Sequence, residues 1–144
     1  MDGLSVASGV AGLLSLCIQV SMALNEYYSG VANASKSIQS LQQEFITLEH
    51  VMKQLEDFLR SQNLRDNAFD ETSVLCSAVG ACKYQVNDIF TKLRRPGGGS
   101  ISRAVKRLEW PFQEKDVLSM VEKLRRYIQT FQFSLTVEGW SVTP

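Results

Sequence analysis

Apolar residues recur at alternating steps of three and four positions along most of the chain. The clearest row, between Ser35 and Ser61, comprises Ile38, Leu41, Phe45, Leu48, Met52, Leu55 and Leu59. This spacing places every member on one side of an α-helix and is typical of helices that pack in bundles. The NASKS segment before it offers Asn33 or Ser35 as a helix cap, and SQNLRDN after it is rich in turn-forming residues.

Two later segments repeat this rhythm. One starts near Asp70 and stops at Pro96, and its row is Leu75, Val79, Cys82, Val86, Ile89 and Leu93. A short helix capped by Ser100 is expected next, with Ile101, Val105 and Leu108 on one face; Trp110-Pro111 then ends or kinks it. The final row is Val117, Val121, Leu124, Ile128, Phe131 and Leu135. The sequence predicts an all-α bundle of four long helices plus a short connecting helix, forming one domain over residues 1–144.

The first helix is expected in a stretch without any charge, from Gly3 to Asn25. At about 1.5 Å per residue it would reach roughly 34 Å, enough to cross a hydrocarbon core of about 30 Å. A thin polar stripe nevertheless runs along it, formed by Ser5, Ser8, Gly12, Ser15 and Gln19. This interrupted pattern favours a core helix of a bundle over a permanent membrane span.

The chain start and the cysteines indicate a cytoplasmic protein. Asp2 is the only charge before the apolar stretch, whereas a secretory signal needs a basic leading segment. Three cysteines, Cys17, Cys76 and Cys82, are an odd number without CxxC spacing. We interpret all three as buried, reduced thiols.

Basic residues gather on both sides of the Pro-Gly-Gly-Gly segment. Sixteen residues without any acid contain Lys92, Arg94, Arg95, Arg103, Lys106 and Arg107. Such a cluster is typical of contact with anionic lipids, and an ordinary solvated loop explains it equally well. Nucleic acid is disfavoured as a partner, because the aromatic residues that stack on bases are not interleaved with these cations.

Catalytic chemistry finds little support in the sequence. His50 is the single histidine and lies outside the apolar row of its helix, which predicts an exposed side chain. The glycines at 97–99 lack the Lys-Ser/Thr pair of a phosphate-binding loop and follow no apolar strand. We therefore expect no enzyme, no catalytic or metal-binding residues and no cofactor.

Three segments together resemble the HeLo-like or HELL-type N-terminal domains of fungal NLR-like (STAND) proteins. They are the opening MDGLSVASGVAGLLSLCIQV, the heptad segment SIQSLQQEFITLEHVMKQLEDFL, and RLEWPFQEKDVLSMVEKLRRYIQTFQFSLTV near the end. The resemblance implies the N-terminal part of a longer protein with nucleotide-binding or repeat modules downstream. It also implies a domain that permeabilises membranes in regulated cell death, as in heterokaryon incompatibility.

In that role the protein would self-associate on activation and move from the cytoplasm to anionic lipids of the plasma membrane. The residues expected to insert are Val10, Leu13, Leu14 and Ile18, and the six basic residues above would contact the lipid. The alternative is a non-toxic interaction or oligomerisation module. Phe133 and Trp140 could be exposed for that purpose, although the helical spacing of the aromatic residues favours core packing.

Overall fold

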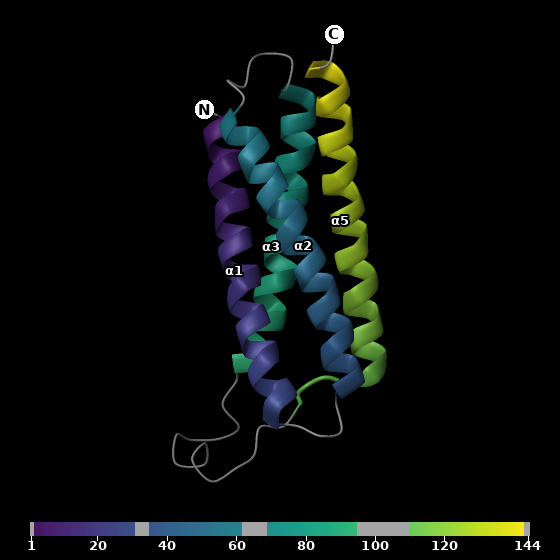
Figure 1. Ribbon diagram of the computed structural model, residues 1–144. Coiled ribbons are helices and arrows are strands. Elements are labelled where there is room, and N and C mark those ends of the chain that lie inside the picture. The colour runs from purple at the N-terminus through teal and green to yellow at the C-terminus, as the bar shows by residue number, and fades with distance from the viewer. Residues whose placement is uncertain (1, 31–34, 62–68, 95–109, 143–144) are drawn as a thin grey trace.

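Four long helices, each antiparallel to the one before it, make up the protein (Figure 1). The computed structural model describes residues 2–30, 35–61, 69–94 and 110–142. The helices are α1 (Asp2–Gly30), α2 (Ser35–Ser61), α3 (Phe69–Arg94) and α5 (Glu114–Val142). The predicted all-α bundle of four long helices is confirmed, with no strand in these ranges. The expected short helix after Ser100 lies outside the described residues.

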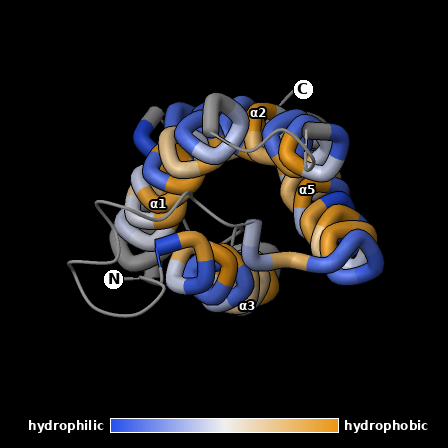
Figure 2. Tube along the Cα trace, turned by 90° about the horizontal axis from the view of Figure 1, so that it is seen from below, coloured by the Kyte–Doolittle hydropathy of each residue, from blue (hydrophilic) through white to orange (hydrophobic). Residues whose placement is uncertain are grey.

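The four helices form a ring in the order α1, α2, α5, α3, as the view along the bundle shows (Figure 2). Helix α1 packs extensively against both α2 and α3, whereas the α3–α5 seam is the weakest of the four. Helices α1 and α5 stand at opposite corners, and so do α2 and α3. Of the four described helices, α1 therefore makes the most extensive contacts with its neighbours, and α5 makes the least extensive.

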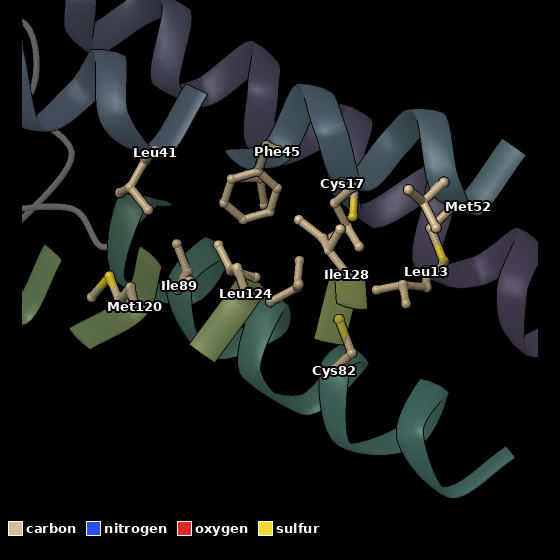
Figure 3. Close-up of a cluster of buried hydrophobic side chains, with 14 of the residues drawn as sticks. Leu13, Cys17, Leu41, Phe45, Met52, Cys82, Ile89, Met120, Leu124 and Ile128 are labelled. Atoms are coloured by element: carbon tan, nitrogen blue, oxygen red, sulfur yellow. The ribbon is translucent and has the colours of Figure 1, made fainter. Parts of the chain in front are cut away.

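The apolar rows of all four helices meet in one core (Figure 3). Phe45 on α2, Cys82 on α3 and Leu124 on α5 point into it from three sides. The largest fully buried side chains are Phe45, Phe131, Leu13, Leu24, Ile38, Leu41, Leu48, Met52, Leu55, Ile89 and Leu124. Burial of apolar area on this scale is the main force that holds such a bundle together.

Helix α1 contributes a complete row to this core. Its fully buried members are Val10, Leu13, Cys17, Val20 and Leu24. Helix α3 packs beside this row: a Cβ added at Gly9 would meet Cγ1 of Val79 at 3.4 Å, and one added at Gly12 would meet Nζ of Lys83 at 3.4 Å, both ordinary van der Waals distances. In the described structure one apolar row of this uncharged stretch packs in the core, as the sequence pattern favours.

An aromatic cluster closes the end of the bundle where α1 ends and α5 begins. Trp110 makes edge-to-face contacts with Tyr27 at 5.4 Å and with Phe112 at 5.1 Å between ring centroids. The Tyr27 hydroxyl donates a 2.7 Å hydrogen bond to the carbonyl of Leu93, one of the last carbonyls of α3. The carbonyl of Gln113 then accepts hydrogen bonds from the amides of Asp116 and Val117 in the first turn of α5, both at 3.0 Å. Residues 110–113 are non-helical and lead into α5, whereas the short helix that Trp110-Pro111 is expected to end lies outside the described residues.

Two predictions about single side chains are wrong. Cys76 is exposed, because it stands about 100° around α3 from buried Leu75 and faces outward. Phe133 is 69% exposed, since it lies two positions from the buried Phe131 and falls outside the core row of α5. The side chain of Trp140 lies outside the described residues.

Candidate functional site

A shallow apolar groove runs along the outer surface between α1 and α2. Its volume is about 350 Å³, and its lining residues are Ile18, Ser21, Met22, Asn25, Gln42 and Ile46. None of the six carries a formal charge at neutral pH. The lining residues therefore offer apolar contact and amide or hydroxyl hydrogen bonding.

Helical spacing explains how these side chains come together. Ile18 and Met22 are four residues apart and stand one above the other on α1, while Ile46 forms the opposite wall on α2. Two hydrogen bonds between the helices fix how far α1 is shifted along α2. Ser21 donates to the Glu49 carboxylate, and Gln39 donates to the Tyr28 hydroxyl at 3.1 Å.

The walls of the groove are unusually open for apolar side chains. The exposed fractions are 44% for Ile18, 65% for Met22 and 49% for Ile46. Single exposed apolar residues are common on protein surfaces, and here three of them share one hollow and form a small apolar patch. The open methionine adds adaptability, because its unbranched side chain can reshape to fit a partner.

The four candidate membrane-inserting residues lie at different depths. Val10 and Leu13 are fully buried in the core, Leu14 is partly buried against it, and Ile18 is exposed in the groove. They therefore form no common outward face in this packed state. Only Ile18 could meet a partner without a change in α1.

Two of the six candidate lipid-binding cations lie within the described part of the chain. Lys92 is exposed and pairs with Asp88 at 3.2 Å, and the exposed Arg94 stands 5.3 Å from the centre of the Phe90 ring. Arg95, Arg103, Lys106 and Arg107 lie outside the described residues. Of the cations farther along, Arg125 binds the buried Glu44 carboxylate at 2.9 Å and joins α5 to α2.

The described residues include no group of three or more His, Cys, Asp or Glu side chains that could hold a metal ion. His50 is exposed on α2, as the sequence predicts. Burial raises the pKa of the Cys17 thiol, with smaller contributions from Cys82 and Glu49, and burial alone raises the pKa of Cys82 to about 12. Both thiols therefore stay protonated near neutral pH, which is unfavourable for a nucleophile.

Helix α1 also has the length and composition of a membrane span. The segment Ser8–Tyr28 has a mean hydropathy of 1.4, and only 33% of its most apolar window is buried within the protein. The outer face of α1 exposes Ile18, Met22 and Tyr28 among polar residues such as Ser15 and Gln19.

Sequence reasoning had selected Ile18 but missed Met22 and Ile46. Ile46 directly follows the core residue Phe45, so it falls outside the heptad row that the sequence predicts to be buried. The available signal was the combination of an off-row isoleucine on α2 with an uncharged outer face on α1. Locating the groove also required knowledge that these two helices are neighbours.

Comparison with known proteins gives this chain a family. Residues 1–138 match the family described as pigment biosynthesis cluster protein PigL N-terminal. A relative, azaphilone pigments biosynthesis cluster protein L of Monascus ruber, is 26% identical over 133 residues, which make up 88% of this chain and 28% of that protein. The chain thus spans less than a third of that relative's length, and no solved structure matches it. It belongs to the family of N-terminal domains of pigment biosynthesis cluster protein PigL.

Proposed function

We propose that this chain is a non-enzymatic interaction domain at the N-terminal end of a longer fungal protein, and that its binding surface is the α1–α2 groove. One observation carries the proposal: helix α1, which has no charge from Gly3 to Asn25, buries a single apolar row and leaves Ile18 and Met22 open beside Ile46. Its partner would present apolar side chains to this surface. Each Å² of apolar surface that the contact removes from water would favour association by about 25 cal/mol.

A neutral hydrophobic dye tests whether the groove takes up apolar groups. Nile red should bind the wild-type chain with a rise in fluorescence, and Met22→Gln/Ile46→Gln should weaken the binding about tenfold because both apolar walls become polar. The matched control is Leu118→Gln, which removes an exposed aliphatic side chain from α5, away from the groove. Equal dye binding by all three proteins would overturn the proposal.

A second candidate function is the membrane-targeting effector of regulated cell death that the HeLo-like resemblance implies. The observation in its favour is the candidate span Ser8–Tyr28. Insertion would require α1 to leave the core, where five of its side chains are fully buried. At about 1.5–3 kcal/mol for each side chain, their loss is comparable to the whole stability of a small domain. In this mechanism the resting domain holds α1 in the core, and activation, self-association and anionic lipids together release it.

Vesicle leakage distinguishes this second function from the first. With the chain fused to a coiled coil that forces assembly, dye-loaded vesicles containing phosphatidylserine should leak, and less so at high salt. Ser15→Asp places a charge on an exposed position of α1 and should leave the fold intact. In an inserted helix the same charge opposes insertion by about 2.5–3.5 kcal/mol, enough to reduce partitioning roughly 100-fold.

The matched control for this experiment is Ser77→Asp, which adds the same charge to an exposed position of α3. Vesicles should leak with Ser77→Asp as they do with the wild-type fusion, because α3 does not insert in this mechanism. Intact vesicles with the wild-type fusion, or equal leakage by Ser15→Asp and the parent, would remove the membrane function.

A further inference from the structure

We propose that the bundle opens along the seam between α3 and α5: helix α5 moves away from α3, stays on α2, and leaves α1 in the core. The apolar interior would then become accessible through one side of the fold. This motion does not depend on the α1–α2 groove, because it does not separate the two helices that form the groove. The inference rests on how unequally the four seams of the ring are held together (Figure 2).

The polar contacts between helices avoid the α3–α5 seam. Within the described ranges, two hydrogen bonds join α1 to α2, the Tyr27 hydroxyl joins α1 to α3, and Arg125 joins α5 to α2. No hydrogen bond or ion pair between described residues joins α3 to α5, and this seam also has the least extensive packing of the four. Separation of α5 from α3 therefore breaks apolar contacts alone among these residues.

The flank of α5 toward α3 carries hydroxyl groups that bond within their own helix. Arg125 marks the flank toward α2, and the half-buried Thr130 and Ser134 stand about 140° and 180° around the helix from it. The Thr130 hydroxyl donates to the Arg126 carbonyl at 3.0 Å, and the Ser134 hydroxyl donates to the Thr130 carbonyl at 3.1 Å. Both hydroxyls keep these acceptors when the seam opens, so the opening leaves neither of them unsatisfied.

The opposite flank of α5 is held to α2 by a buried carboxylate. The Arg125 Nε donates to Glu44 at 2.9 Å, and Glu44 is only 7% exposed. A charge-assisted bond to a buried group is stronger than a bond between neutral groups, and its loss is costly. Helix α5 therefore stays attached along α2, and its edge toward α3 is the one that is free to move.

Cys82 lies where such an opening would expose it. A Cβ added at Gly9 or Gly12 of α1 would meet Val79 or Lys83, so these two residues mark the flank of α3 toward α1. Cys82 stands about 60° around α3 from Val79, on the side away from Lys83. Its fully buried side chain therefore faces the core on the side of α5 (Figure 3).

Cys17 would stay covered in the same motion. It is fully buried on α1, one turn before Ser21, whose hydroxyl donates to Glu49 of α2. Helix α1 keeps its place between α2 and α3 when α5 moves, so Cys17 keeps its cover. Release of α1 would instead expose Cys17 at least as readily as Cys82, and complete unfolding would expose both thiols equally.

Labelling of the native chain with N-ethylmaleimide tests the opening, and tandem mass spectrometry assigns the label to each cysteine. The exposed Cys76 should react at once and serves as the control for the reagent. With each rate divided by its value in concentrated urea, Cys82 should react at least about tenfold faster than Cys17, because a partial opening is populated more often than complete unfolding. Equal rates for the two buried thiols, or faster labelling of Cys17, would overturn the proposal. So would a Cys82 that stays unlabelled for days while Cys76 reacts.

A charge placed in the seam tests where the bundle opens. Ala78 is half-buried on the flank of α3 away from α1, so Ala78→Glu should favour the open state and raise the ratio of Cys82 to Cys17 labelling about tenfold. The matched control is Ser77→Glu, which adds the same charge at the exposed neighbouring position and should leave the ratio unchanged. Circular dichroism shows whether each variant is folded, and the wild-type ratio decides if Ala78→Glu is not. A folded Ala78→Glu chain with the wild-type ratio would contradict an opening at this seam.

Discussion

Leu13→Ala is expected to lower the free energy of unfolding by about 2–5 kcal/mol. The Leu13 side chain is fully buried in the core, so truncation both exposes less apolar area on unfolding and leaves a cavity. Helix α1 lies between α2 and α3, and it cannot move to fill that cavity without disturbing either contact. Urea titration followed by circular dichroism measures the loss.

Leu118→Ala is the matched control, because it makes the same chemical change at a side chain that is 62% exposed on α5. It should alter the unfolding free energy by no more than about 0.5 kcal/mol. If the two variants lose similar stability, Leu13 does not occupy the core position described for it, and the packed arrangement of α1 would be wrong.

A steep loss of stability above pH 9 is the second large expected effect. Burial raises the pKa of both Cys17 and Cys82 above the ordinary thiol value of 9.0. Above pH 9 the unfolded chain releases these two protons while the folded chain keeps them, so rising pH favours unfolding. Below pH 9 both states stay protonated and this contribution to stability is fully present.

For two thiols the expected slope approaches about 3 kcal/mol per pH unit once the unfolded thiols ionise. Urea titrations at several values between pH 8 and 10 measure it; the pKa of Tyr27 is also raised from 10.0, so this phenol adds to the slope by the same mechanism only near the upper end of the range. Cys17→Ala/Cys82→Ala should flatten the profile, whereas Cys76→Ala, which removes an exposed thiol, should not. A double variant as alkali-sensitive as the parent would contradict the assignment.

The helices and the core could be predicted from the sequence because one-sided burial requires a periodic pattern. Every member of the row from Ile38 to Leu59 is buried, and α1 uses the row that begins at Val10. The outward positions follow no such rule. Cys76, Phe133 and Ile46 are residues of types that are often buried, yet each stands on an outer face, and residue type alone does not reveal that.

The arrangement of the helices could not be predicted from the same pattern. A heptad row shows that a helix packs against something, but it does not tell which helices are its neighbours. The groove depends on the packing of α1 against α2, which the hydrogen bond between Ser21 and Glu49 holds in register. The candidate site therefore became visible only with the tertiary structure, whereas the uncharged face of α1 that contributes to it was already clear in the sequence.

The corner position of α1 has a consequence for synthesis on the ribosome. Synthesis runs from the N-terminus to the C-terminus, so α1, the most apolar of the four described helices, leaves the exit tunnel before the other three. Both of its neighbours, α2 and α3, precede α5 in the chain, and α5 stands at the opposite corner (Figure 2). A nascent chain that ends near Arg94 thus already holds every helix that α1 packs against extensively. The helix most prone to aggregate can be sheltered cotranslationally, before the last quarter of the bundle is translated.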